Sequence, residues 1–173
     1  MRRQDIIIAA LFLGSGAALL VYILSGISLL ITFSVILAGA VVIGVIVWKT
    51  APDPKKADLK KKFRIGLIAG LLAMIAYDLS RLLLVTLTPM TVWPFEAFMV
   101  FGQAFIGEEI RSTGVFFLGV IYHIVNALAF AVAYTLAFGK KGPWYGLAWA
   151  MILEVVMWLV YPGWLNLHKI GHF

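Results

Sequence analysis

The chain has 173 residues, of which 63% are hydrophobic and 13% charged, and its mean hydropathy is +1.02. This composition leaves too few polar side chains to cover a soluble domain, so the sequence indicates an integral membrane protein. The chain contains no cysteine, which excludes disulfides, thiolate metal sites and cysteine nucleophiles. The net charge of +6 comes largely from lysines and arginines gathered in short segments.

Five apolar stretches are each long enough to cross a bilayer core, which takes about 20 residues in a helix. They are continuously apolar and lack the alternating pattern of barrel strands. The sequence therefore predicts an all-α fold, a polytopic membrane helix bundle of five transmembrane helices plus one re-entrant or interfacial helix. The predicted spans are Ile6–Leu24, Ile27–Trp48, Ile65–Leu87, Gly114–Phe138 and Trp144–Trp164.

Residues 1–48 are predicted to form an N-terminal transmembrane hairpin with a tight turn between its two spans. The first apolar run continues through Leu24 and is longer than a signal-peptide core, so we interpret it as an uncleaved anchor. Small residues in the hairpin allow helices to approach closely, which favours a role in packing or oligomerisation. These residues are Gly14, Gly16, Gly39 and Gly44.

Residues 49–64 contain most of the lysines and are predicted to form a basic cytoplasmic loop. With five spans, this loop, the amino terminus and the pair Lys140-Lys141 all face the cytoplasm, and the carboxyl terminus lies outside. We expect a multi-pass protein of the cell (inner) membrane whose basic loop rests on anionic lipids. The positive charge is thereby explained without a nucleic-acid partner.

Residues 65–173 are predicted to form a C-terminal unit of three spans with an outer re-entrant or interfacial segment at 91–110. The apolar part of this segment has only about 15 residues, which is too short for a span. It also contains Pro94, Glu96 and Gln103. Its phenylalanines recur every three or four residues, so we expect a short helix that covers the unit from outside.

Three ionisable residues, Asp78, His123 and Glu154, lie deep inside three different predicted spans. A charged residue at the centre of a membrane helix costs about 3 kcal/mol or more, so such residues are by default functional candidates. Each has a polar or aromatic neighbour on its own helical face, at i+3 or i+4. With these neighbours the candidate buried polar site comprises Asp78, Arg81, His123, Asn126, Glu154 and Trp158.

For each of these groups, the sequence also allows a role in packing rather than in function. Asp78 and Arg81 have the spacing of an intrahelical ion pair. His123 fits a histidine that hydrogen-bonds across helices. Glu154 has no basic residue within one turn on its own helix, so burial would keep it protonated, which suits proton exchange.

The paired carboxylates Glu108-Glu109, followed by Arg111, resemble part of the motif of metal-dependent intramembrane proteases of the prenyl-endopeptidase type. That family has three residues between the second glutamate and the arginine, and histidine motifs on later helices, whereas this chain has a single deep histidine. We therefore interpret these charges as solvated interfacial groups and expect no metal site and no cofactor.

A set of positions between Ile65 and Leu167 follows a family pattern: Gly66-Leu67-Ile68-Ala69-Gly70, His123-Ile124, Phe130-Ala131-Val132, Tyr134, Trp144, Gly146, Leu147 and Pro162. Through them the chain resembles the YagU-like inner-membrane proteins and their small four-helix relatives of unknown function. The resemblance implies an inner-membrane protein connected with acid tolerance. The chain departs from this pattern in its N-terminal hairpin and in Trp158, where a histidine is expected.

Three function classes follow from these features. A buried polar site for proton-linked transport or acid homeostasis accounts for the three deep ionisable groups together. An accessory or structural subunit, in a homo-oligomer or a larger membrane complex, accounts for the small size and the glycine-rich hairpin. A metal-dependent intramembrane enzyme accounts for the fewest features, so the sequence favours a protein that is not an enzyme.

Overall fold

The computed structural model describes residues 3–88, 93–139 and 141–164, without the side chains of residues 3, 4, 143, 158 and 161–164. The regular secondary structure of the described residues consists of seven helices, with no strand among them. The all-α prediction is therefore confirmed. The helices are α1 (Arg3–Phe12), α2 (Gly14–Ser25), α3 (Leu29–Thr50), α4 (Asp53–Leu87), α5 (Glu96–Ile106), α6 (Thr113–Phe138) and α7 (Pro143–Trp164).

Helices α3, α4 and α6 are long and apolar enough to cross a membrane. A fourth crossing is present if α1 and α2 are taken together, although these two helices meet at an angle of 49°. The described residues thus support a membrane helix bundle with three or four candidate spans rather than the five predicted. In the last predicted span, the apolar stretch whose side chains are described, Trp144–Met157, is shorter than a crossing requires.

The break in the first predicted span lies at Leu13, whose N–H bonds to the carbonyl of Ala10 as in a tighter helical turn. Directly after it, a side chain on Gly14 would meet Ile36 of α3 at 2.7 Å. One turn further, a side chain on Gly16 would meet the Phe130 ring of α6 at 2.5 Å. The bend thus lets the backbone of α2 pack directly against α3 and α6.

The basic segment 49–64 is helical over most of its length, so its prediction as a loop was wrong. Only Ala51 and Pro52 separate α3 from α4. Pro54 lies in the first turn of α4, where its missing N–H costs nothing, and Asp53 complements the positive end of the helix dipole. Ion pairs one turn apart, such as Lys62–Asp58 at 3.0 Å, stabilise the helix further.

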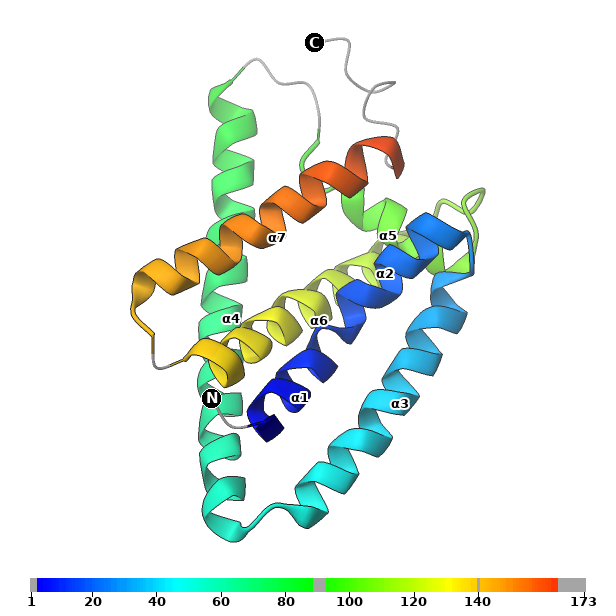
Figure 1. The fold of residues 1–173 in the computed structure, drawn as a ribbon. Helices are drawn as coiled ribbons and strands as arrows, with labels where there is room; N and C mark the ends of the chain where they lie inside the picture. The colour runs from blue at the N-terminus through cyan, green and yellow to red at the C-terminus, as the bar shows by residue number, and fades with distance from the viewer. Residues whose placement is uncertain (1–2, 89–92, 140, 165–173) are drawn as a thin grey trace.

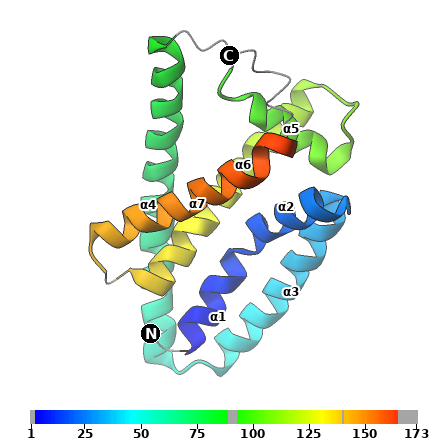
Figure 2. The ribbon, with the colours of Figure 1, turned by 45° about the horizontal axis from the view of Figure 1, so that its top comes forward.

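Helices α4 and α6 cross and pack extensively, and α5 packs on the N-terminal half of α6 (Figure 1). Gly66 and Gly70 of α4 form a small-residue motif at this crossing. A Cβ on Gly66 would lie 2.8 Å from the Cα of Val132, so the two backbones touch. Helices α1 and α2 lie between α6 and α3 in both views (Figure 2).

Helix α5 has 11 residues and is therefore about 16 Å long, against about 30 Å for a bilayer core. The predicted short helix is thus present, although residues 91 and 92 of the predicted segment lie outside the described residues. Its phenylalanines Phe98 and Phe101 are buried in a core cluster with Tyr122 of α6. The re-entrant or interfacial placement of α5 stays a prediction.

Candidate functional site

Asp78 of α4 and His123 of α6 form a pair at the crossing of the two helices. The carboxylate oxygen Oδ2 of Asp78 lies 3.1 Å from Nε2 of His123. The two side chains are largely buried, with 21% and 16% of their surfaces exposed. By helical rise, Asp78 lies about 14 Å from the C-terminal end of α4 and His123 about 15 Å from the N-terminal end of α6, so both lie well inside helices that are long enough to cross a membrane.

The second carboxylate oxygen of Asp78, Oδ1, is buried and has no hydrogen-bond partner among the described residues. A buried acceptor without a partner costs roughly 1–3 kcal/mol, so this oxygen marks a place where a proton or a water molecule would be stabilised. On the other side of the pair, the ring of Phe98 lies 4.8 Å from the imidazole of His123. Phe98 of α5 therefore covers the imidazole of His123.

Asn126 lies one turn along α6 from His123 but points to a different partner. Its Oδ1 accepts a hydrogen bond of 2.7 Å from the hydroxyl of Ser15, and the carbonyl of Ser15 accepts a hydrogen bond from the hydroxyl of Tyr122. Sequence reasoning missed Ser15, although its position between Gly14 and Gly16 was a signal of close helix packing. Asn126 thus fixes α2 on α6 and is not in direct contact with Asp78.

Arg81 takes part in a cation–π contact instead of the intrahelical ion pair that its spacing allows. Its guanidinium lies 5.4 Å from the centre of the Tyr77 ring. In the ion pairs of the described residues, Asp78 is paired with His123 and not with Arg81. Arg81 remains within electrostatic range of the Tyr77 hydroxyl, as do Asp78 and Glu154.

Glu154 is exposed on α7, whose described side chains are mostly exposed as well. The structure therefore brings Asp78 and His123 into contact, while Glu154 approaches the same region from the loosely packed α7 without touching the pair. The side chain of Trp158, the remaining residue of the predicted site, lies outside the described residues.

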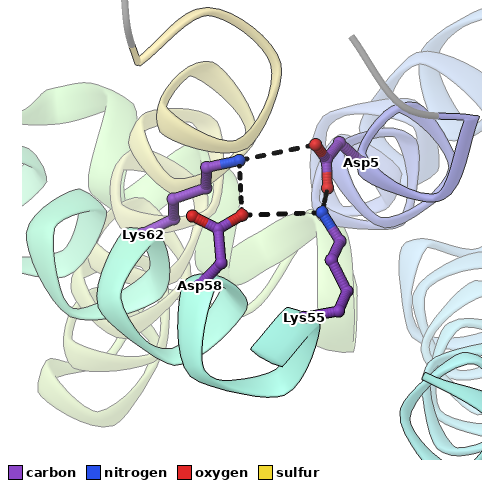
Figure 3. A network of polar contacts seen from close by, with 4 residues as sticks. All are labelled: Asp5, Lys55, Asp58 and Lys62. Atoms are coloured by element: carbon purple, nitrogen blue, oxygen red, sulfur yellow. Dashed lines mark hydrogen bonds and ion pairs between the residues drawn. The ribbon is translucent and has the colours of Figure 1, made fainter. Parts of the chain in front are cut away.

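A second polar cluster, which sequence reasoning missed, joins α1 to the first turns of α4 (Figure 3). Asp5 of α1 pairs with Lys55 and, at 3.4 Å, with Lys62 of α4. Asp58 lies between the two lysines, 3.6 Å from Lys55 and 3.0 Å from Lys62. Only 5% of Asp5 and 4% of Lys55 are exposed, so this pair is buried, whereas 42% of the Asp58 side chain is exposed.

The network carries two positive and two negative charges. Its three members on α4 lie before the apolar part of that helix. A hydrogen bond from Lys62 lowers the pKa of the Asp58 carboxyl. Burial acts against the charge of Lys62, but the hydrogen bonds and charges of Asp58 and Asp5 outweigh it and raise the pKa of this amine. A cavity of about 890 Å³ lies beside the network and is bordered by the end of α6 and by Lys141.

The acidic residues near α5 are not arranged as metal ligands. Arg111 pairs with Glu96 at 2.7 Å, and Glu108 accepts a hydrogen bond from Tyr22. Within the ranges that the structure describes, no three side chains of histidine, aspartate or glutamate converge on a common point.

Comparison of the chain with models of protein families, with curated proteins and with solved structures finds no match. The resemblance to the YagU-like inner-membrane proteins therefore stays a prediction.

Proposed function

We propose that this chain is a multi-pass membrane protein in which the Asp78–His123 pair binds and releases a proton, in proton-linked transport or acid homeostasis. The observation that carries the proposal is the 3.1 Å contact between the two groups deep within α4 and α6. Imidazole is the side chain that most often transfers protons in proteins, and a carboxylate beside it fixes the orientation of the ring. Ionisable pairs within membrane helices are typical of proton relays.

In the proposed cycle, a proton from one side binds to the imidazole of His123, and the resulting cation is stabilised by the Asp78 carboxylate. Release of the same proton returns the pair to a single negative charge. Oδ1 of Asp78, which is buried without a described partner, supplies a second position for the proton during transfer. Phe98 of α5 covers the imidazole, so a movement of α5 would control access from the outer end.

The proposed topology retains five crossings, with α1 and α2 as one bent crossing and the whole of α7 as the last, since its 22 residues are long enough although the apolar stretch with described side chains is shorter. The amino terminus and the ion network face the cytoplasm, and the carboxyl terminus lies outside, as the positive-inside rule favours. Helix α4 supports this arrangement because its 35 residues extend about 52 Å, well beyond a bilayer core of about 30 Å. Its basic first turns would then lie among anionic headgroups of the inner membrane.

Proton movement through purified protein in liposomes tests this function. With an imposed pH gradient and a pH-sensitive dye inside the vesicles, we expect wild-type protein to accelerate proton flux. Asp78→Asn should reduce the flux at least about tenfold, because the histidine loses the charge that stabilises its protonated form. His123→Gln should reduce it by a similar factor, because the variant lacks the imidazole that carries the proton.

Glu109→Gln is the matched control, since it removes one carboxylate from an exposed position outside the pair. Its flux should equal that of the wild type. If Asp78→Asn and His123→Gln proteins fold and retain wild-type flux, the pair is a structural contact and the proposal is wrong.

A second function, as a subunit of a larger membrane assembly, is favoured by the exposure of Glu154 on α7. A carboxylate on the lipid-facing side of a membrane helix is energetically costly unless a partner chain covers it. The molar mass of the protein in nanodiscs tests this idea. We expect at least two chains of 19.1 kDa per particle and dissociation by Glu154→Lys but not by Glu109→Lys. Single chains in wild-type particles would contradict it.

A further inference from the structure

A groove lined almost wholly by apolar side chains runs between α3 on one side and α1, α4 and α6 on the other. Its volume is about 580 Å³, which is within the usual range of roughly 300–1,000 Å³ for ligand sites. Along α3 its lining extends from Phe33 to Trp48, which corresponds to about 22 Å of helix. This length exceeds the thickness of one leaflet of the bilayer core, about 15 Å.

One end of the groove differs in chemistry from its middle. Lys60 of α4 lines the groove together with Trp48, and its amine lies 5.6 Å from the centre of the Trp48 ring. A tryptophan and a lysine together are typical of the headgroup region of a membrane. The middle of the groove is lined by aliphatic and aromatic residues of α3 and α6, such as Ile36 and Leu128.

Among the described residues, no acidic side chain forms an ion pair with Lys60 at its end of the groove. Asp5 and Asp58 are paired with Lys55 and Lys62 in the ion network. The cation of Lys60 is therefore available at the end of an apolar groove, and the complementary ligand has a long apolar chain and an anionic head.

We propose that this groove binds one acyl chain of an anionic phospholipid, with the phosphate at Lys60. The lipid would lie between α3 and the α4/α6 pair, beside the bend between α1 and α2, whose residues Phe12 and Gly14 also line the groove. This site is separate from the Asp78–His123 pair and does not depend on the function proposed for it.

The test uses the full chain purified in neutral detergent and native mass spectrometry with added dioleoyl lipids. We expect phosphatidylglycerol to bind about fivefold more tightly than phosphatidylcholine, because one lysine contributes to the recognition of the anionic head. Lys60→Gln should remove this preference. Lys61→Gln, which changes an exposed neighbour that does not line the groove, should leave the preference unchanged.

Gly44→Phe fills the groove and should weaken binding of both lipids about tenfold or more. A side chain at Gly44 meets no atom within 4 Å, so the substitution places its ring in open space. Gly39 is equally open and lies on the same helix but outside the groove, so Gly39→Phe is the matched control. Ala40→Leu fills the groove less and provides the same test if Gly44→Phe does not fold.

Equal binding of the two lipids to wild-type protein would overturn the proposal. So would an equal loss of binding in Gly39→Phe and Gly44→Phe, or an equal loss of preference in Lys61→Gln and Lys60→Gln.

Discussion

Replacing Asp5 by alanine should lower the free energy of unfolding by about 3 kcal/mol. The substitution leaves Lys55 buried without its main partner, and breaking a buried ion pair from one side typically costs roughly 3–5 kcal/mol. We place the expected value at the lower end, because Asp58 remains 3.6 Å from Lys55. Equilibrium unfolding of the purified protein in mixed micelles with increasing dodecyl sulfate measures the change.

Asp53→Ala is the control for this prediction. Asp53 also pairs with a lysine of α4, Lys56 at 3.2 Å, but 95% of its side chain is exposed. Exposed pairs of this kind contribute about 0–1 kcal/mol, so Asp53→Ala should have little effect.

The double variant Asp5→Leu/Lys55→Met should recover most of the lost stability, because it removes both buried charges and retains apolar volume. A loss for Asp5→Ala no larger than that for Asp53→Ala would show that the network does not hold α1 to α4.

The long helices were predictable because their apolar runs are continuous. The predicted spans Ile27–Trp48 and Gly114–Phe138 differ from α3 and α6 by no more than two residues at either end. The break at Leu13 was not predictable in the same way. It contains no proline, and the bent path is fixed by contacts of Gly14 and Gly16 with α3 and α6, which are distant in sequence.

The prediction of a loop at residues 49–64 was wrong for a reason that lies within this segment. A high density of lysines is typical of a solvated segment. Lysine is also a good helix former, however, and aspartates three or four residues before a lysine form ion pairs that stabilise a helix. Asp53 and Asp58 supply those aspartates. Helix α4 therefore begins at Asp53 and continues without a break into the apolar span.

The sequence identified Asp78 and His123 as candidates but did not predict that they pair. Counting residues along the predicted spans places Asp78 about 10 Å and His123 about 14 Å from the outer ends of their spans, which leaves the partner of each side chain open. The choice of His123 over Arg81 as partner depends on how α4 crosses α6 at Gly66 and Gly70. The ion network was missed for the same reason, because Asp5 and Lys55 lie 50 positions apart in the chain.

Replacing Gly119 by alanine should separate α5 from α6 and lower the free energy of unfolding by about 2–3 kcal/mol. A Cβ on Gly119 would lie 1.7 Å from the carbonyl oxygen of Phe98, and backbone atoms cannot give way as flexible side chains do. Because Phe98 covers His123, the separation should also raise deuterium exchange in α5 and change the rate of proton flux.

Gly114→Ala, on the same helix, is the matched control. The nearest atom to its added Cβ is the Ser112 hydroxyl oxygen at 3.8 Å, an ordinary contact distance. Alanine favours a helix by up to about 1 kcal/mol over glycine, so Gly114→Ala should be neutral or slightly stabilising. The two substitutions are chemically identical and should change stability in opposite directions or by clearly different amounts. Equal stability and equal exchange in α5 for both variants would contradict the close backbone contact between α5 and α6, and with it the role of α5 as the cover of the Asp78–His123 pair.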